Sequence, residues 1–340
     1  MNKDNETMAL RICDWKYGKD WVYSITYDEA LADLHRFAIP HHEEFGIPGH
    51  VEVVGQQIGE IRNIGTSSFN GYRHMNGAEL KDLLARGWGV GNHGWSHHFI
   101  RPDMVDQEIR LSRDVIEQAI DAPVLLYCAP NGIENMSDYV LDACRQLGYL
   151  GTMSITDGVN AASDELYYLN RTPLHESYEE PFYSAYDPFR HILLAQEAKG
   201  WIIDYCHCPL EQAVHPNKDC SEAQLRLRLQ TIIAEGGDQV WCAVPEEVIS
   251  YHLCRRHAVV ETVAATDLEQ RYRIRYEALP ARVERRELTF EVEVPAAWCN
   301  YPRVWVNGVP QSASVVRPRL LRTTVAVEDG TELQFRPLTS

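Results

Sequence analysis

The sequence has no long apolar run and no excess of positive charge. Its 340 residues include 49 acidic and 32 basic side chains, which gives a net charge of −17. A surface of this sign repels phosphate backbones and anionic lipid headgroups, so we expect neither nucleic acid nor a membrane as a partner. No window approaches the ~18 uninterrupted apolar residues of a membrane-spanning helix, and the first residues, MNKDNETMALRICDW, lack the apolar core of a signal peptide. The sequence as given therefore predicts a soluble, cytoplasmic protein.

Paired cysteine spacings, internal repeats and low-complexity tracts are also absent. The nine cysteines are an odd number scattered along the chain, and Cys206 and Cys208 stand too close together for an ordinary disulfide framework. We therefore expect reduced thiols rather than a disulfide-stabilised fold. The length exceeds that of one typical core and predicts one large domain with a smaller one.

Strand-like and helix-like segments alternate up to residue 258. Short apolar, β-branched or aromatic runs cover 21–27, 50–55, 123–130, 151–156 and 201–208. Apolar residues at helical spacing cover 28–45, 76–87, 101–120 and 137–149. This alternation predicts parallel strands joined by crossover helices, in either a barrel or a doubly wound sheet.

The pattern changes near residue 258. From there, runs such as RYRIRYEAL, ELTFEVEVP and PRVWVNGVP alternate apolar with polar residues, and Asn307-Gly308 and Asp329-Gly330 are turn pairs. The sequence thus predicts a domain over 1–258 and a small antiparallel, β-sandwich-like domain over 259–340. We favour a role in packing or assembly for the smaller domain, which leaves a homo-oligomer open.

A histidine-rich segment, GNHGWSHH (91–98), follows an apolar run broken by glycine. His93 and His97 stand four residues apart, so one helical turn would place both imidazoles on the same face, where they could bind a metal ion. The alternative is a polar loop without a ligand.

Two further groups fall at the ends of predicted strands, where the reactive groups of parallel α/β proteins gather. Asp28 and Glu29 end the first strand, and adjacent carboxylates repel unless a cation or a proton takes up the charge. A helix N-terminus would also explain them. His207 ends the last strand of the large domain; a structural histidine beside the strand is its alternative. Taken together, the three groups predict a metal site of one carboxylate and two histidines. The remaining carboxylate and histidine could then act as a base and an acid.

The segments SITYDEAL, NGAELKDLLARGWGVGNHGWSHH, IRLSRDVIEQAIDAPVLLYCAPNG, VLDACRQLGYLGTMSIT and WIIDYCHC, in this order, resemble the NodB-homology polysaccharide deacetylases, carbohydrate esterase family four. The resemblance covers roughly residues 20–257 and implies an α/β fold, a distorted (β/α) barrel of about seven strands. It also implies residue roles: Asp28 as catalytic base, Glu29, His93 and His97 as metal ligands, His207 as catalytic acid and the Asn131 backbone N–H as oxyanion donor.

This chain departs from the family pattern at two positions. Glu29 stands where the family has Asp, a longer side chain that can still ligate a metal. Cys128-Ala129-Pro130-Asn131 stands where the family has Arg-x-Pro-(Tyr/Trp), so the arginine that orients the base is missing. Either the pocket lacks this cation, or another basic residue such as Arg171 or Arg73 replaces it.

The resemblance implies a metal-dependent hydrolase in which ion-activated water removes an acetyl group from a carbohydrate or a small acetylated metabolite. Zinc suits two imidazoles and a carboxylate, and cobalt, nickel or manganese share those ligands. Two other functions stay open: an amidase acting on non-acetyl C–N bonds such as those of cyclic imides and ureides, and a carbohydrate-binding or structural protein without catalysis.

Overall fold

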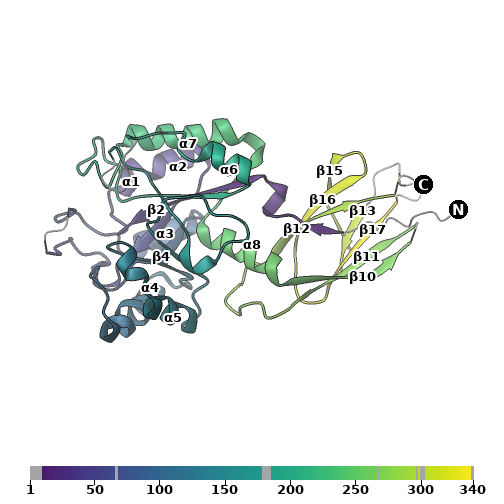
Figure 1. Cartoon of the computed structure of the whole chain (residues 1–340), viewed down its shortest axis with the longest axis horizontal. Helices are drawn as coiled ribbons and strands as arrows, with labels where there is room; N and C mark the ends of the chain where they lie inside the picture. The colour runs from purple at the N-terminus through teal and green to yellow at the C-terminus, as the bar shows by residue number, and fades with distance from the viewer. Residues whose placement is uncertain are drawn as a thin grey trace. The chain divides into compact units, whose positions relative to one another are not determined.

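The structure, a computed structural model, describes residues 10–65, 68–177, 185–266, 268–295, 298 and 303–337 (Figure 1). Contacts divide the chain into two compact units. One spans Asp20–Ile249, and the other combines the N-terminal residues up to Lys19 with the residues from Ser250 onward. No helix in these described ranges is long and apolar enough to cross a membrane.

The unit Asp20–Ile249 is built on eight parallel strands. They run in the order β6-β5-β4-β3-β2-β8-β7, and β9 pairs with β2. The strands are β2 (Trp21–Asp28), β3 (His50–Val53), β4 (Gly89–Asn92), β5 (Leu126–Cys128), β6 (Gly151–Met153), β7 (Thr172–Pro173), β8 (Trp201–Cys206) and β9 (Val240–Cys242). The predicted α/β fold of distorted-barrel type is confirmed, and every strand predicted in this unit is present.

Helices flank these strands on both sides (Figure 1). They are α1 (Leu34–Phe37), α2 (Ile39–Phe45), α3 (Gly77–Ala85), α4 (Ser112–Ile120), α5 (Asp138–Gln146), α6 (Ile192–Ala198) and α7 (Glu222–Gly236). Helix α3 begins at a capping box, in which the Asn76 side chain accepts from the Glu79 N–H and the Glu79 carboxylate accepts from the Asn76 N–H. The predicted helix over 28–45 is shorter than expected, because Glu29 and Ala30 have positive φ angles of 74° and 51° and turn the chain before α1 begins.

A charged cluster lies buried among β3, β4 and the start of helix α8 (Pro245–His257). His50 Nδ1 is 2.8 Å from a Glu52 carboxylate oxygen, and His50 Nε2 is 3.1 Å from a Glu246 oxygen. Gly89 and Gly91 leave room for these groups, since a Cβ at Gly91 would lie 2.1 Å from Glu52 Oε2. A buried imidazolium therefore neutralises carboxylates in this core.

This cluster predicts a pH-dependent stability. Burial alone would lower the pKa of His50, but the Glu246 and Glu52 carboxylates outweigh burial and raise the pKa from 6.5 to about 10. The stabilisation is then complete below pH 6.5 and is lost as the pH rises towards 10, with a slope of ~1.4 kcal/mol per pH unit. Urea unfolding of His50→Gln, which keeps hydrogen-bonding groups but cannot gain the charge, should show no such slope. An equal slope in the variant and the wild type would show that another group is responsible.

The second unit consists of two antiparallel sheets. One has the order β1-β12-β16-β15 and the other β10-β11-β17-β13-β14. The strands are β1 (Arg11–Ile12), β10 (Ala258–Ala265), β11 (Gln270–Tyr276), β12 (Glu287–Glu293), β13 (Arg303–Val306), β14 (Val309–Gln311), β15 (Ser314–Arg317), β16 (Leu320–Ala326) and β17 (Thr331–Arg336). The predicted small antiparallel β domain is thus confirmed. Asn307 and Gly308 form the two-residue turn of the β13-β14 hairpin, both with positive φ.

The division into units differs from the predicted limits 1–258 and 259–340 at both ends, because the N-terminal residues up to Lys19 join the β unit and the second division falls between Ile249 and Ser250. Strand β1 pairs with β12, so Arg11 and Ile12 complete a sheet of the β unit. Strand β10, the first of the C-terminal strands, begins at Ala258. That an independently folding domain ends at residue 258 stays a prediction.

Candidate active site

A cavity of about 770 Å³ opens at the carboxyl ends of the parallel strands. The six residues singled out in the sequence all line it: Asp28, Glu29, His93, His97, Asn131 and His207. They follow strands β2, β4, β5 and β8, whose carboxyl ends meet because the strands are parallel. The structure therefore brings the whole predicted set together.

Asp28 is held by a buried arginine. The Arg171 guanidinium donates from Nη1 to Asp28 Oδ1 at 2.6 Å and from Nη2 to Oδ2 at 3.1 Å. Arg171 is itself fixed: Nε donates to the Ser154 carbonyl, Nη1 donates to the Thr26 hydroxyl, and the guanidinium lies 4.3 Å from the centre of the Tyr205 ring. Such a two-point pair sets both the charge and the orientation of the carboxylate.

Arg171 takes the place of the arginine missing from the Cys128 position. Burial alone would raise the pKa of Asp28, but the Arg171 charge outweighs burial and holds this pKa below its ordinary value. Cys128 adds a thiol contact at 3.8 Å from Asp28 Oδ1, and burial raises the pKa of this thiol well above its usual range. Of the two proposed replacements, Arg73 pairs instead with Glu79.

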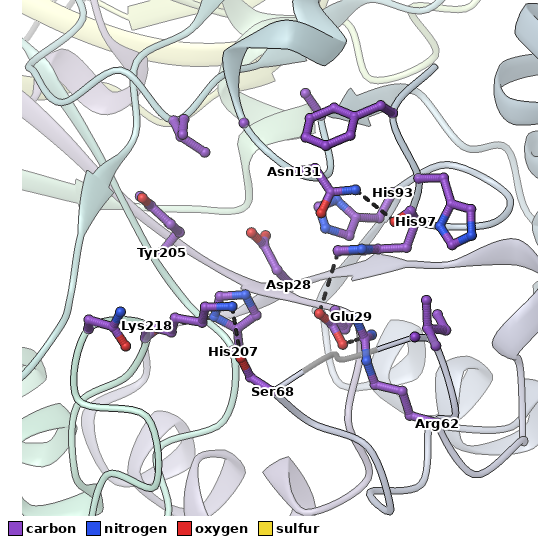
Figure 2. Close-up of a pocket in the computed structure, with 18 of the residues that line it drawn as sticks. Asp28, Glu29, Arg62, Ser68, His93, His97, Asn131, Tyr205, His207 and Lys218 are labelled. Carbon is purple, nitrogen blue, oxygen red and sulfur yellow. Dashed lines mark hydrogen bonds and ion pairs between the residues drawn. The ribbon is translucent and has the colours of Figure 1, made fainter. Parts of the chain in front are cut away.

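Glu29 contacts one guanidinium and one imidazole at the cavity wall. One oxygen forms an ion pair with Arg62, and the other lies 3.5 Å from His97 Nε2. Figure 2 shows these contacts on one side of Asp28 and His207 on the other. Glu29 and Arg62 are both almost fully buried, so their charges face each other with little water between them.

His93 and His97 are brought together by a loop rather than by the helical turn that their spacing would allow. Their ring centroids are 5.1 Å apart. The buried Glu108 carboxylate holds the loop by accepting from the Trp95 and Ser96 N–H groups. Gly94, at φ 80°, sits against this carboxylate, since a Cβ there would lie 3.2 Å from Glu108 Oε2. A side chain at position 94 would therefore crowd this carboxylate and strain the backbone, and glycine avoids both.

The donor set beside Asp28 fits a divalent ion. His93 Nδ1 bonds to the Cys128 carbonyl at 3.0 Å, and this leaves Nε2 as the lone-pair donor. Burial lowers the pKa of His93 and of His97, which favours the neutral imidazole that a metal requires. Among the described residues, the group whose ligand atoms all lie within 4.8 Å of one another is Asp28, His93 and Cys128, so a possible metal site is present but with a different membership from the predicted one.

His207 stands across Asp28 from the histidine pair (Figure 2). Its Nδ1 lies 3.1 Å from the Lys218 carbonyl, and its ring stacks on Phe69 with centroids 5.1 Å apart. Asp219 accepts from the His207 and Cys208 N–H groups and fixes this turn. Burial lowers the pKa of His207 to about 4, although the Asp28 charge opposes this shift.

Asn131, in the loop after β5, contacts the loop after β4 that carries His97. Its side-chain Nδ2 donates to the His97 carbonyl at 2.7 Å. Asn131, His97 and Glu29 all have positive φ angles, of 56°, 57° and 74°. Such conformations are uncommon for non-glycine residues and cluster at functional sites.

Motif reasoning did not find Arg62, Glu108 or Asp219. Arg62 and Asp219 lie in connecting segments, and Glu108 lies on a π-helical stretch (Asp106–Leu111) within the helix predicted over 101–120. Each is recognised only by the group it contacts in the fold. Arg171 was named from sequence only as one of two candidate cations. The only sequence signal for Arg171 is that it is a charged residue in a segment without helical or strand periodicity. This signal is weak, because many surface residues share it.

An α/β barrel with carboxylates and imidazoles gathered at its strand ends has the acidic and basic side chains that hydrolysis uses. Residues 16–151 match the family model described as polysaccharide deacetylase. This segment carries Asp28, Glu29, His93, His97 and Asn131, and over it the resemblance drawn from the motifs is confirmed. His207 lies beyond the matched residues.

Solved structures of deacetylases are among those similar to this chain. The Streptococcus pyogenes deacetylase PplD, in complex with acetate, is 18% identical over 44% of this chain and 62% of that one, with a TM-score of 0.38. IcaB from Ammonifex degensii is 16% identical over 44% and 66%, with a TM-score of 0.39. The polysaccharide deacetylase Bc1974 from Bacillus cereus is 14% identical over 66% and 91%, with a TM-score of 0.41. The chain thus spans less than two thirds of the first two. A search of curated proteins gave no match.

Proposed function

We propose that the protein is a metal-dependent deacetylase that hydrolyses an acetyl amide or ester of a carbohydrate or of a small acetylated metabolite. One observation carries the proposal. Asp28, held ionised by Arg171, lies between the Glu29–His97–His93 group and His207 in a single cavity. A base, an acid and a ligand set around one space are what the hydrolysis of an acyl group needs.

Asp28 acts as the base that takes a proton from the attacking water. A base must be unprotonated, and Arg171 keeps the carboxylate in that form. The same two hydrogen bonds fix its orientation, so water is deprotonated from a defined direction. No covalent intermediate with the protein is needed.

His207 acts as the acid on the leaving group. With a pKa of about 4 the ring is neutral before the reaction, and the Lys218 carbonyl at Nδ1 fixes its orientation. Negative charge that develops on the reacting acyl group raises the proton affinity of the ring, so Nε2 takes up a proton from solvent and passes it to the departing amine or alcohol. The proton that Asp28 took from water returns to solvent, and the proton count balances.

The Asn131 backbone N–H serves as an oxyanion donor. Within the described ranges, no protein acceptor takes this N–H. Glu29, His93 and His97 would hold a divalent ion, and their ligand types suit zinc. When bound, such an ion would polarise the acyl carbonyl and lower the pKa of water. The Asn131 N–H, together with such an ion, would stabilise the negative charge that develops on the acyl oxygen.

The metal site predicts one divalent ion per chain. Elemental analysis of zinc-supplemented protein should give one equivalent, and a crystal structure of that protein should show Glu29, His93 and His97 at ~2.0–2.2 Å from the ion. His93→Ala and His97→Ala should each lose it. Side chains more than ~5 Å apart in the zinc-supplemented crystal would contradict the assignment, since one ion cannot bridge that gap.

The substrate class is tested by a paired screen. We expect the metal-loaded protein to release acetate, with an equal amount of free amine or hydroxyl groups, from chitin oligomers or acetylated xylan. Opening of cyclic imides without acetate release would favour the amidase instead. Arg171 supplies beside Asp28 the positive charge that the Cys128 position lacks, which supports the deacetylase over the amidase.

A further inference from the structure

The Arg62 side chain places a positive charge beside Glu29, one of the proposed metal ligands. Its side chain lines the cavity, is almost fully buried and forms an ion pair with Glu29. The other Glu29 oxygen faces His97 Nε2 at 3.5 Å (Figure 2). One carboxylate is therefore shared between a guanidinium and the imidazole that would bind the ion.

The backbone around Arg62 holds it in this position. The Arg62 N–H donates to the Tyr72 carbonyl at 2.7 Å, and the Gly71 N–H donates to the Arg62 carbonyl at 2.9 Å. Ile61 and Arg73 form an isolated antiparallel bridge beside these bonds. These backbone hydrogen bonds fix the part of the chain between β3 and α3 that carries Arg62. The Arg62 guanidinium is therefore held next to Glu29 by the fold itself.

A guanidinium keeps its positive charge, and a buried carboxylate needs a cation beside it. Arg62 therefore neutralises Glu29 when no ion is bound. It also repels any divalent ion that approaches the same carboxylate, and in a buried site this repulsion is poorly screened. The two effects act in the same direction, because both lower the free energy gained when an ion binds.

We propose that Arg62 competes with the divalent ion for Glu29 and makes ion binding at this site weak and reversible. This inference rests on the proposed metal site. By Coulomb's law for charges a few ångströms apart in a partly polar site, removal of the guanidinium charge should tighten ion binding on the order of 100-fold.

Zinc affinity, measured by competition with a chromogenic chelator, tests the proposal without an activity assay. Arg62→Met removes the charge and keeps most of the side-chain volume, and it should bind zinc ~100-fold more tightly than the wild type. Arg62→Lys keeps the charge and should stay within a few-fold. Arg73→Met is the matched control, because Arg73 lies on the same segment but pairs with Glu79, and it should not change the affinity.

Thermal unfolding provides a second readout. Without zinc, Arg62→Met should melt below the wild type, because Glu29 loses its cation. With zinc it should gain more in melting temperature, as tighter binding requires. Arg62→Gln, a polar replacement of similar length, is the substitute if Arg62→Met does not fold.

The outcomes separate this inference from the function proposed above. Equal zinc affinity in the wild type and in Arg62→Met, or an equal gain in Arg62→Lys and Arg62→Met, would overturn the role of the Arg62 charge and leave the metal site standing. Absence of zinc binding in all variants and in the wild type would overturn the metal site and this inference together.

Discussion

Asp28→Asn is expected to lower turnover by ~10²–10⁴-fold, the range typical for loss of a general base. Asparagine has nearly the same shape as aspartate but cannot take a proton from water. Zinc binding should persist, because the proposed ligands are Glu29, His93 and His97. Initial rates of acetate release, together with zinc content, measure both effects in one preparation.

The control is Asp204→Asn. Asp204 forms an equally buried pair with Arg228, at 2.8 Å and 3.2 Å, but does not line the cavity. It should lower the melting temperature and leave turnover per folded molecule unchanged. Turnover within about a factor of two of the wild type in Asp28→Asn would place the base elsewhere.

Arg171→Met is expected to reduce the rate at neutral pH by ~10²-fold and to move the acid limb of the pH–rate profile to higher pH by ~1–3 units. In the wild type, Arg171 lowers the pKa of Asp28 against the effect of burial. Without the arginine, burial remains and raises this pKa, so the carboxylate becomes ionised only at higher pH. The profile of kcat/KM between pH 4 and 9 measures the shift.

Arg171→Lys is the matched variant, since it keeps the charge but loses the two-point hydrogen bonding. It should retain most of the position of the acid limb and lose part of the rate. Cys128→Arg should not lower the acid limb, because the cation is already present. An acid limb that stays in place in Arg171→Met would show that Asp28 does not control it.

The sequence predicted Asp28, Glu29 and His207 from their places at strand ends, His93 and His97 from their spacing, and Asn131 from the family resemblance. Asp28 ends β2, and His93 and His207 directly follow β4 and β8. The carboxyl ends of parallel strands meet at one rim, whichever conformation the loops adopt. The loop geometry could not be predicted in this way. His93 and His97 meet because Glu108, on a π-helical turn, holds the loop between them, and no periodicity encodes that contact.

The two arginines show the same limit. Arg171 and Arg62 reach Asp28 and Glu29 from positions 143 and 33 residues further along the chain. Pairing at such separation depends on the tertiary fold, and a single sequence does not say which of its many arginines is buried. Strand β1 was missed for a similar reason, since two residues that pair with distant β12 have no local signature.

The central claim is that water, deprotonated by Asp28, attacks the acyl carbon directly. A single turnover in heavy-oxygen water, with enzyme in excess over an O-acetylated carbohydrate, tests this claim through the isotopic composition of the products. The account predicts acetate that carries one heavy oxygen from the first turnover and a sugar hydroxyl that carries none. Unlabelled acetate in the first turnover would mean that a protein carboxylate supplied the oxygen. Label in the sugar would mean that the bond between sugar and oxygen had broken, and either result would contradict the mechanism.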